Sequence, residues 1–134
     1  MKVEAYLSFE GRANEAIEHY RKAVGAEVTL LHLFKEAPPE VQCSPESANL
    51  VMHAALRIGE STVLVSDGQC SGKSVFQGIS LTLTVKDEAE AERRYAALAE
   101  GGNALMPLHQ PFFAKSFGMV ADRFGVQWMV IAPV

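Results

Sequence analysis

The alternation of apolar and polar residues predicts a first strand over residues 3–9 (VEAYLSF), with one core face and one polar face. Apolar residues then recur at helical spacing, which predicts a helix from Glu15 to Val24, capped by Asn14 and ended by Gly25. A proline-rich loop is expected over residues 36–49. The three further strands of this first half are expected at 27–34, 50–58 and 61–66.

The same order of elements is predicted again after a Gly/Ser-rich connection at residues 67–78. The expected elements are a strand at 77–85, a helix at 87–100 with Asp87 as its N-cap, and strands at 103–110, 115–121 and 126–134. Pro107 cannot donate a ladder hydrogen bond, so it favours an edge position for its strand.

Two phrases recur in the same order in both halves. EAIEHY at residues 15–20 returns as EAERRY at residues 90–95, and ALRIGESTVLV at 55–65 aligns with ADRFGVQWMVI at 121–131. The first of these segments could recur by chance, because it is a common helix-forming sequence. Agreement of the second segment as well favours a duplication. The pattern predicts one α+β domain over residues 1–134, built from two βαβββ modules, 1–70 and 75–134, joined by a Gly/Ser-rich linker.

Several stretches are similar to one known family. They are YLSFEGRANEAIEHY, VMHAALRIG, VLVSDG, SLTLTV and, most specifically, FGMVADRFGVQWMV. Together they resemble the PhnB-like branch of the vicinal oxygen chelate superfamily, which includes glyoxalase I and bleomycin-resistance proteins. The resemblance implies a cupped mixed sheet with the helices outside and a small-molecule pocket inside. It also implies a homodimer, possibly formed by exchange of modules.

The resemblance places metal ligands on the first and fourth strands of each module. In this sequence those positions hold Glu4, Val63 or Val65, Ser80 and Met129. Of these only Glu4 is a plausible ligand, whereas a catalytic metal site needs about three protein ligands. No metal and no other cofactor is therefore expected.

His53 is the histidine of greatest interest, because it lies on the same face of a predicted strand as Val51, Ala55 and Arg57. If that face lines the pocket, His53 contacts a ligand or accepts a proton; otherwise it is a hydrogen-bonded structural residue. His53 and Glu4 are the candidate catalytic residues. The full set expected to contact a ligand is Glu4, Tyr6, His53, Ser80, Thr82, Phe113, Phe117 and Met129, with Trp128 turned toward a helix.

Composition narrows the class of protein further. The chain has 134 residues, a net charge of −4, 49% hydrophobic residues and no basic run, so no nucleic-acid partner is expected. No apolar run is long enough to span a bilayer, and Glu4 interrupts any signal-peptide pattern, so a cytoplasmic location is expected. Cys43 and Cys70 are expected to be free thiols.

The stretch from Gly68 to Ser74 (GQCSGKS) is similar to a phosphate-binding loop, but it has three residues between its glycines where the motif needs four. A strand rather than a helix is also expected after it, so nucleotide hydrolysis is not expected. This segment is either a solvated linker or a loop that closes over the pocket with Asp67 and Lys73.

Three functions stay open from the sequence. The first is binding of a small molecule in the cup without the usual metal site. The second is a metal-dependent lyase, isomerase or dioxygenase with unusual ligands, such as Glu4 and His53. The third is a non-catalytic interaction subunit whose pocket is filled by Met129, Phe117 and Tyr6. Whether the protein is an enzyme is left undecided by the sequence.

Overall fold

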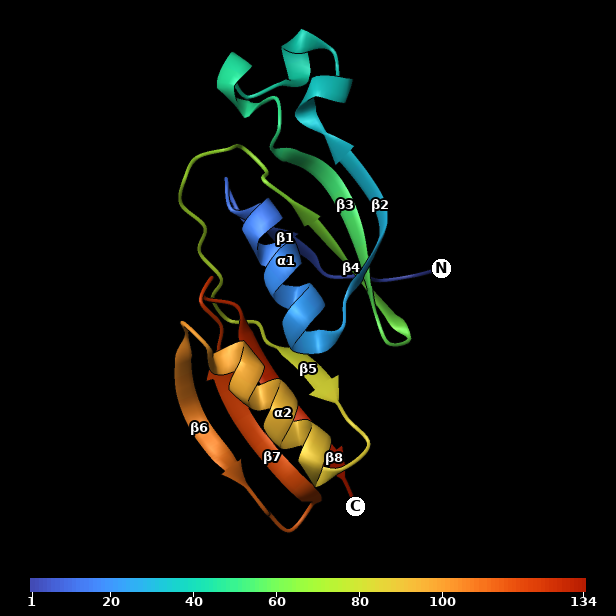
Figure 1. Ribbon diagram of the computed structural model, residues 1–134, viewed down its shortest axis with the longest axis vertical. Helices are drawn as coiled ribbons and strands as arrows, with labels where there is room; N and C mark the ends of the chain where they lie inside the picture. Colours follow the sequence, from blue (N-terminus) through green and yellow to red (C-terminus); the bar gives the residue numbers. More distant parts are fainter. The chain divides into compact units, whose positions relative to one another are not determined.

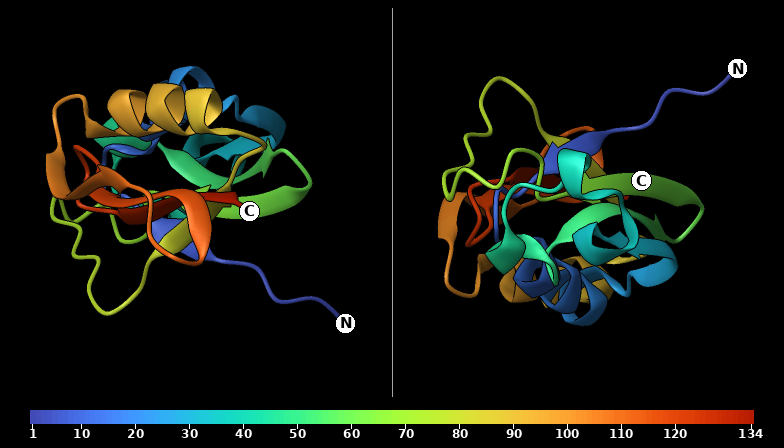
Figure 2. Two further views of the ribbon diagram at one scale, coloured as in Figure 1. Left: turned by 90° about the horizontal axis from the view of Figure 1, so that it is seen from below. Right: turned by 90° about the horizontal axis from the view of Figure 1, so that it is seen from above.

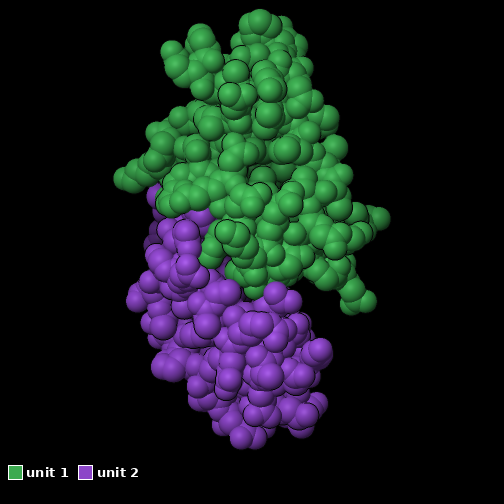
Figure 3. Space-filling model, viewed as in Figure 1, with its two compact units in different colours: residues 1–74 green, residues 75–134 purple.

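The computed structural model describes all 134 residues, which divide into two compact units, Met1–Ser74 and Val75–Val134 (Figure 3). Unit 1 contains one four-stranded sheet, one α-helix and three short 3-10 helices. Its elements are β1 (Tyr6–Ser8), α1 (Ala13–Val24), β2 (Glu27–Leu33), η1 (Phe34–Glu36), η2 (Pro39–Val41), η3 (Pro45–Ser47), β3 (Val51–Ile58) and β4 (Ser61–Ser66). The strand order is β1-β4-β3-β2, with β1 parallel to β4 and the other pairs antiparallel.

Unit 2 repeats this topology in a second, separate sheet. Its elements are β5 (Leu81–Thr84), α2 (Glu88–Ala99), β6 (Asn103–His109), β7 (Ala114–Ala121) and β8 (Gln127–Pro133), in the order β5-β8-β7-β6. In each unit the helix lies across one face of its own sheet (Figure 1). The predicted α+β fold with two βαβββ repeats is therefore confirmed.

The core of unit 1 lies between α1 and one face of its sheet. Leu7, Val65 and Ala54 are register partners across three strands, and all three are buried. Tyr20 and Phe9 are also almost fully buried, with their ring centroids 6.1 Å apart. Burial of each large apolar side chain contributes about 1.5–3 kcal/mol, so this layer fixes which face of the sheet α1 covers.

Two strands are shorter than their alternation predicts. β1 begins only at Tyr6, and Val3, expected on the core face, is 95% exposed within an extended N-terminal segment (Figure 2). β5 begins only at Leu81, which pairs with Trp128 near the start of β8. Alternation shows which residues are able to form a strand, but it does not show how many of them pair with the neighbouring strand.

The expected caps of the two helices have different outcomes. Asp87 caps α2 as predicted, because its carboxylate accepts a hydrogen bond from the Glu90 N–H at 2.8 Å. Asn14 does not cap α1, since its side-chain amide donates to the Asn49 carbonyl at 3.1 Å. Gly25 ends α1 in the left-handed conformation as expected.

Asp67, which comes directly after β4, takes the place of the expected cap of α1. Its carboxylate accepts hydrogen bonds from the backbone N–H groups of Gly11 at 2.7 Å, Ala13 at 2.9 Å and Val51 at 2.8 Å. Asp67 is fully buried. It is therefore neither part of a solvated linker nor available to a ligand; it joins the start of α1 to the start of β3.

The expectation of free thiols is wrong, because Cys43 and Cys70 form a disulfide. The two residues are separated by 27 positions, and their Cα atoms lie 6.1 Å apart. Cys43 lies in the β2–β3 connection and Cys70 in the turn after β4. Both connections leave the sheet at the same end, a proximity that depends on strand order and not on the spacing of the cysteines along the chain.

Candidate functional site

The face of the unit 1 sheet that is turned away from α1 carries a mixed polar and apolar surface. Register partners in a sheet point to the same side. One row across the four strands therefore consists of Tyr6, Leu64, Ala55 and Leu30. In the neighbouring row, His53 on β3 lies opposite His32 on β2. We call this surface, with Tyr6, Leu30, His32, His53 and Leu64, the open face of unit 1.

A hydrogen bond joins Tyr6 and His53 on this face. The Tyr6 hydroxyl lies 2.7 Å from His53 Nδ1, and the two ring centroids are 5.5 Å apart. When the phenol donates to Nδ1, the ring proton of His53 is on Nε2, which can then donate to a further group. Half of the Tyr6 surface is exposed. The pair therefore presents both an aromatic surface and a directed hydrogen-bonding atom to solvent.

His32 is fixed from the other side by Glu36 of η1. His32 Nδ1 lies 3.2 Å from Glu36 Oε1, and the Leu33 N–H donates to Glu36 Oε2 at 2.7 Å. The hydrogen bond from the Leu33 N–H, followed by that from His32, lowers the pKa of Glu36 below its ordinary value. The carboxylate therefore stays ionised beside His32 over the neutral range of pH.

Glu4 and His53 are not brought together as a pair. Glu4 precedes β1 and forms an ion pair with Lys2, with 3.5 Å between Nζ and Oε2. No hydrogen bond or ion pair connects it to His53, whose polar contact is with Tyr6.

The residues at the positions that the resemblance assigned to metal ligands do not fit a divalent ion. Val65 is buried on the α1 side of its sheet, and Ser80 Oγ lies 3.4 Å from Gln127 Oε1. Met129 offers a thioether, which is a poor ligand for hard cations. In the whole chain, no three His, Cys, Asp or Glu side chains are grouped closely enough to hold a metal ion.

The other predicted ligand-contacting residues form a separate cluster in unit 2. Thr82, Met129 and Met119 are register partners on the sheet face turned away from α2. Phe117 lies on the same face, and its ring centroid is 5.3 Å from that of Phe113. As predicted, Trp128 points to the opposite face, where it is 3% exposed and donates through Nε1 to Asp122 Oδ2 at 3.0 Å.

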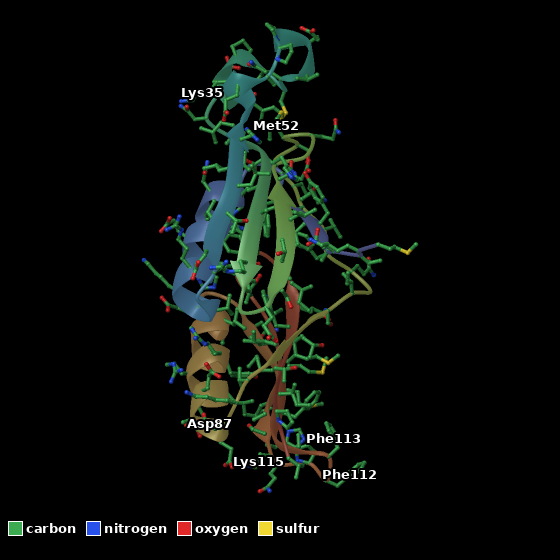
Figure 4. All side chains as sticks on the ribbon, turned by 90° about the vertical axis from the view of Figure 1, so that its right-hand side faces the viewer. Lys35, Met52, Asp87, Phe112, Phe113 and Lys115 are labelled. Atoms are coloured by element: carbon green, nitrogen blue, oxygen red, sulfur yellow. A yellow bond between two sulfur atoms is a disulfide. The ribbon has the colours of Figure 1, made fainter.

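Phe113 continues the unit 2 cluster into the loop between β6 and β7. There Phe112 and Phe113 lie edge to face, with 5.4 Å between their ring centroids, and Phe112 is 98% exposed (Figure 4). Tyr95 supports the buried side of the same sheet, because its hydroxyl contacts the carbonyl oxygens of Met106 at 2.8 Å and Met119 at 3.0 Å. Burial raises the pKa of Tyr95, so its hydroxyl remains a proton donor in neutral solution.

Leu30, His32 and Leu64 belong to the open face of unit 1 but were not predicted from the sequence. His32 shares no short spacing with another histidine. It meets His53 only through strand pairing, with register shifts on both sides of it. Reconstruction of this pairing from the sequence would have required the register of β2 against β3.

Comparison with known proteins agrees with the topology of both sheets. Residues 1–131 match the family described as 3-demethylubiquinone-9 3-methyltransferase. The chain belongs to this PhnB-like family. Protein YjdN of Escherichia coli K12 is 35% identical to the PhnB-like chain over 138 residues, covering 97% of this chain and 94% of that protein.

Solved structures extend the agreement to three dimensions. Protein PA1353 from Pseudomonas aeruginosa is 36% identical to this PhnB-like chain, with a TM-score of 0.86 and coverage of 99% of this chain and 98% of that one. A putative 3-demethylubiquinone-9 3-methyltransferase, PhnB protein, from Bacillus cereus is 26% identical, with a TM-score of 0.81 and coverage of 98% and 99%. A glyoxylase/bleomycin resistance protein/dioxygenase domain from Frankia sp. EAN1pec shares the fold, at 11% identity, a TM-score of 0.66 and coverage of 98% and 94%.

The resemblance to the glyoxalase/bleomycin-resistance fold is therefore confirmed. The helices of this PhnB-like chain are too short and too polar for any of them to span a membrane.

Proposed function

We propose that this PhnB-like protein binds a small organic molecule on the open face of unit 1 and that it does so without a metal ion. The observation that supports this most is the hydrogen bond of 2.7 Å between Tyr6 and His53. It orients two polar groups on a surface to which Leu30 and Leu64 contribute apolar side chains. Apolar walls with a few directed polar atoms are typical of small-molecule sites.

The geometry favours a ligand with a flat apolar body and an acceptor atom. The body stacks against the Tyr6 ring and Leu64, while its acceptor takes a hydrogen bond from His53 Nε2. The proposal does not extend to methyl transfer, because β1 is followed by Phe9-Glu10-Gly11 and a helix, with no glycine-rich cofactor loop.

The proposal includes a homodimer and a cytoplasmic location. Large apolar side chains on β6 and the following loop of unit 2 are exposed and would gain from burial against a second copy; they are Leu105, Met106, Phe112 and Phe113. A protein that binds a ligand on the open face of unit 1 would sequester or sense it, with no covalent step required.

The test uses the fluorescent aromatic sulfonate 1-anilinonaphthalene-8-sulfonate as the probe. We expect saturable binding to the folded protein and at least about fivefold weaker binding to His53→Ala, since loss of one hydrogen bond costs about 1 kcal/mol. Phe112→Ala, in unit 2, is the matched control and should bind the probe as the parent protein does. If only Phe112→Ala weakens binding, or if His53→Ala has no effect, the open face of unit 1 is not the site.

A further inference from the structure

The disulfide joins two segments of unit 1 that are held in very different ways. We propose that Cys43–Cys70 is a thiol–disulfide exchange site, which a small dithiol reduces in the folded protein, and that reduction releases residues 37–47 while the rest of unit 1 keeps its structure. The proposal does not depend on the ligand site, because none of the contacts that support it involves Tyr6, His32 or His53.

The bridge is accessible to a reductant. Cys43 is exposed and Cys70 is partly exposed. None of the residues from 37 to 46 is buried, so no core side chain has to move before a thiolate reaches the Cys43 sulfur. Exchange rates depend on such access.

The exchange balances with a dithiol as the two-electron reductant. One thiolate of the dithiol attacks Cys43 Sγ, the Cys43–Cys70 bond breaks, and Cys70 leaves as a thiolate that takes up a proton. The second thiol of the reductant, deprotonated, then displaces Cys43 Sγ and closes a cyclic disulfide on the reductant. The Cys43 thiolate takes up the second proton, so the protein gains two electrons and two protons.

The segment around Cys70 is held without the bridge. The Glu10 carboxylate accepts hydrogen bonds from the backbone N–H groups of Gln69 and Ser71, the latter at 3.1 Å, and the Glu10 carbonyl accepts from Gly72 at 2.8 Å. Gly68 has a φ of +54°, and a Cβ at this position would collide with the Glu10 carboxylate. Glycine therefore permits the close approach that anchors this turn.

The segment around Cys43 is held mainly by itself. Every hydrogen bond made by residues 37–47 reaches no more than five positions along the chain, as from Gln42 Nε2 to the Ala37 carbonyl at 2.9 Å. Pro38, Pro39 and Pro45 also prevent this segment from joining a strand ladder. The disulfide is thus the long-range link in the middle of residues 37–47. Its loss affects this segment far more than the turn at residues 67–72.

An exchangeable bridge also reconciles the disulfide with the proposed location. Disulfides in reducing compartments are usually transient and redox-sensing, whereas structural ones are found where the surroundings are oxidising. A partly exposed disulfide between an anchored turn and a loosely held loop is typical of the transient, redox-sensing kind.

The experiment treats the oxidised full chain with dithiothreitol in native buffer, alkylates it with iodoacetamide, and follows mass and backbone hydrogen exchange. We expect two alkylated cysteines only after reduction. The reduction rate should be insensitive to urea below the unfolding transition. Exchange within residues 37–47 should rise about tenfold or more, with less than about a twofold change in residues 67–74 and in the strands.

Two variants make the test sharper. The double variant Cys43→Ser with Cys70→Ser should show the released loop without any reductant, whereas Glu10→Gln should loosen residues 69–72 and leave the loop at 37–47 protected by the intact bridge. The proposal is overturned if alkylation occurs without reductant, if reduction requires global unfolding, or if reduction loosens the strands as much as the loop.

Discussion

The Tyr6 hydroxyl and His53 Nδ1 are hydrogen-bonded at 2.7 Å although 47 positions separate the two residues in the chain. They lie on β1 and β3, with β4 between them in the sheet. The contact is therefore a product of strand order, and it assembles two of the residues that the sequence suggested separately. Its role in ligand binding is the central question for this protein.

Removal of the Tyr6 hydroxyl should weaken ligand binding without loss of stability. Tyr6→Phe keeps the ring but leaves His53 without its partner, so we expect about fivefold weaker binding of 1-anilinonaphthalene-8-sulfonate in a fluorescence titration. The matched control is Tyr95→Phe, whose hydroxyl contacts two backbone carbonyls in unit 2. That variant should lose about 1 kcal/mol of stability and bind the probe normally. Equal binding by Tyr6→Phe and the parent would argue against the proposed site.

Substitution of Asp67 should destabilise the protein more than substitution of Asp87. Asp67→Asn replaces a buried acceptor of three backbone N–H groups by an amide, and we expect a loss of about 3 kcal/mol in the free energy of unfolding. Asp87→Ala removes a single helix cap and should cost about 1 kcal/mol. Urea unfolding should be followed by far-ultraviolet circular dichroism, because the single tryptophan, Trp128, lies in unit 2. Similar losses in both variants would contradict the central role of Asp67.

The free energy of unfolding should decrease as the pH falls below 4.5, and part of this decrease should depend on Glu10. Desolvation raises the pKa of Glu10, but hydrogen bonds from Ser71 and Gln69 outweigh it and lower the pKa below the ordinary value of 4.5. A lowered folded-state pKa adds stability above 4.5, and this stability is lost as the pH falls through the folded value.

The effect of Glu10 is measured as the difference between the parent and Glu10→Gln in thermal unfolding from pH 7 to pH 3. The parent should be more stable at neutral pH, by no more than about 1 kcal/mol because the carboxylate is largely solvated, and the two curves should converge in acid. A constant difference over the whole pH range would show that ionisation of Glu10 does not contribute to the stability of the protein.

Divalent metals should not stabilise the folded protein. The positions that the resemblance assigned to metal ligands carry an ion-paired carboxylate, an aliphatic side chain, a hydroxyl and a thioether. Addition of nickel, zinc, manganese or iron(II) to the oxidised protein should therefore shift the melting temperature by less than about 1 °C, since a metal ion raises the stability only if it binds the folded state. A near-stoichiometric metal that raises the melting temperature would favour the metal-dependent enzymes, with Glu4 and His53 as the first residues to substitute.

The exposed apolar side chains of unit 2 predict association of two copies. Light scattering on a size-exclusion column should give twice the mass of the 14.6-kDa chain at micromolar concentration. Phe113→Glu should shift the protein toward the monomer, because a charge on this surface opposes burial. Glu60→Gln, on the exposed β3–β4 turn, is the control and should leave the mass unchanged. A monomeric parent would remove the dimer from the proposed function.

Local signals in the sequence were sufficient for most of the fold. The turn residues Gly59 and Glu60 predicted where β4 starts, a single aspartate predicted the start of α2, and Pro107 predicted that β6 lies at a sheet edge. In each case the deciding interactions connect residues close together in the chain.

The failures all involve partners that are distant in sequence. The cap of α1 comes from Asp67 rather than Asn14, the disulfide closes between two loops, and β1 is limited to the three residues that pair with β4. The same holds for the open face of unit 1, where Tyr6 and His53 were each predicted, but their hydrogen bond and the position of His32 opposite His53 depend on strand register. A pattern of residue types contains no information on register when both neighbouring choices bury an apolar face.

The position of Asp67 also affects the order in which the chain can fold. Asp87 caps α2 by accepting a hydrogen bond from the N–H of Glu90, three positions away, which closes a short loop that forms quickly. The bond from Gly11 to Asp67 spans 56 positions. On the ribosome, α1 therefore cannot acquire its cap until all four strands of unit 1 have been synthesised, whereas α2 is capped by the residue directly before it. The first contacts of α1 therefore form before Asp67, which holds the start of the helix, has been synthesised. A pause in synthesis between residues 24 and 67 would leave the helix uncapped and exposed to aggregation.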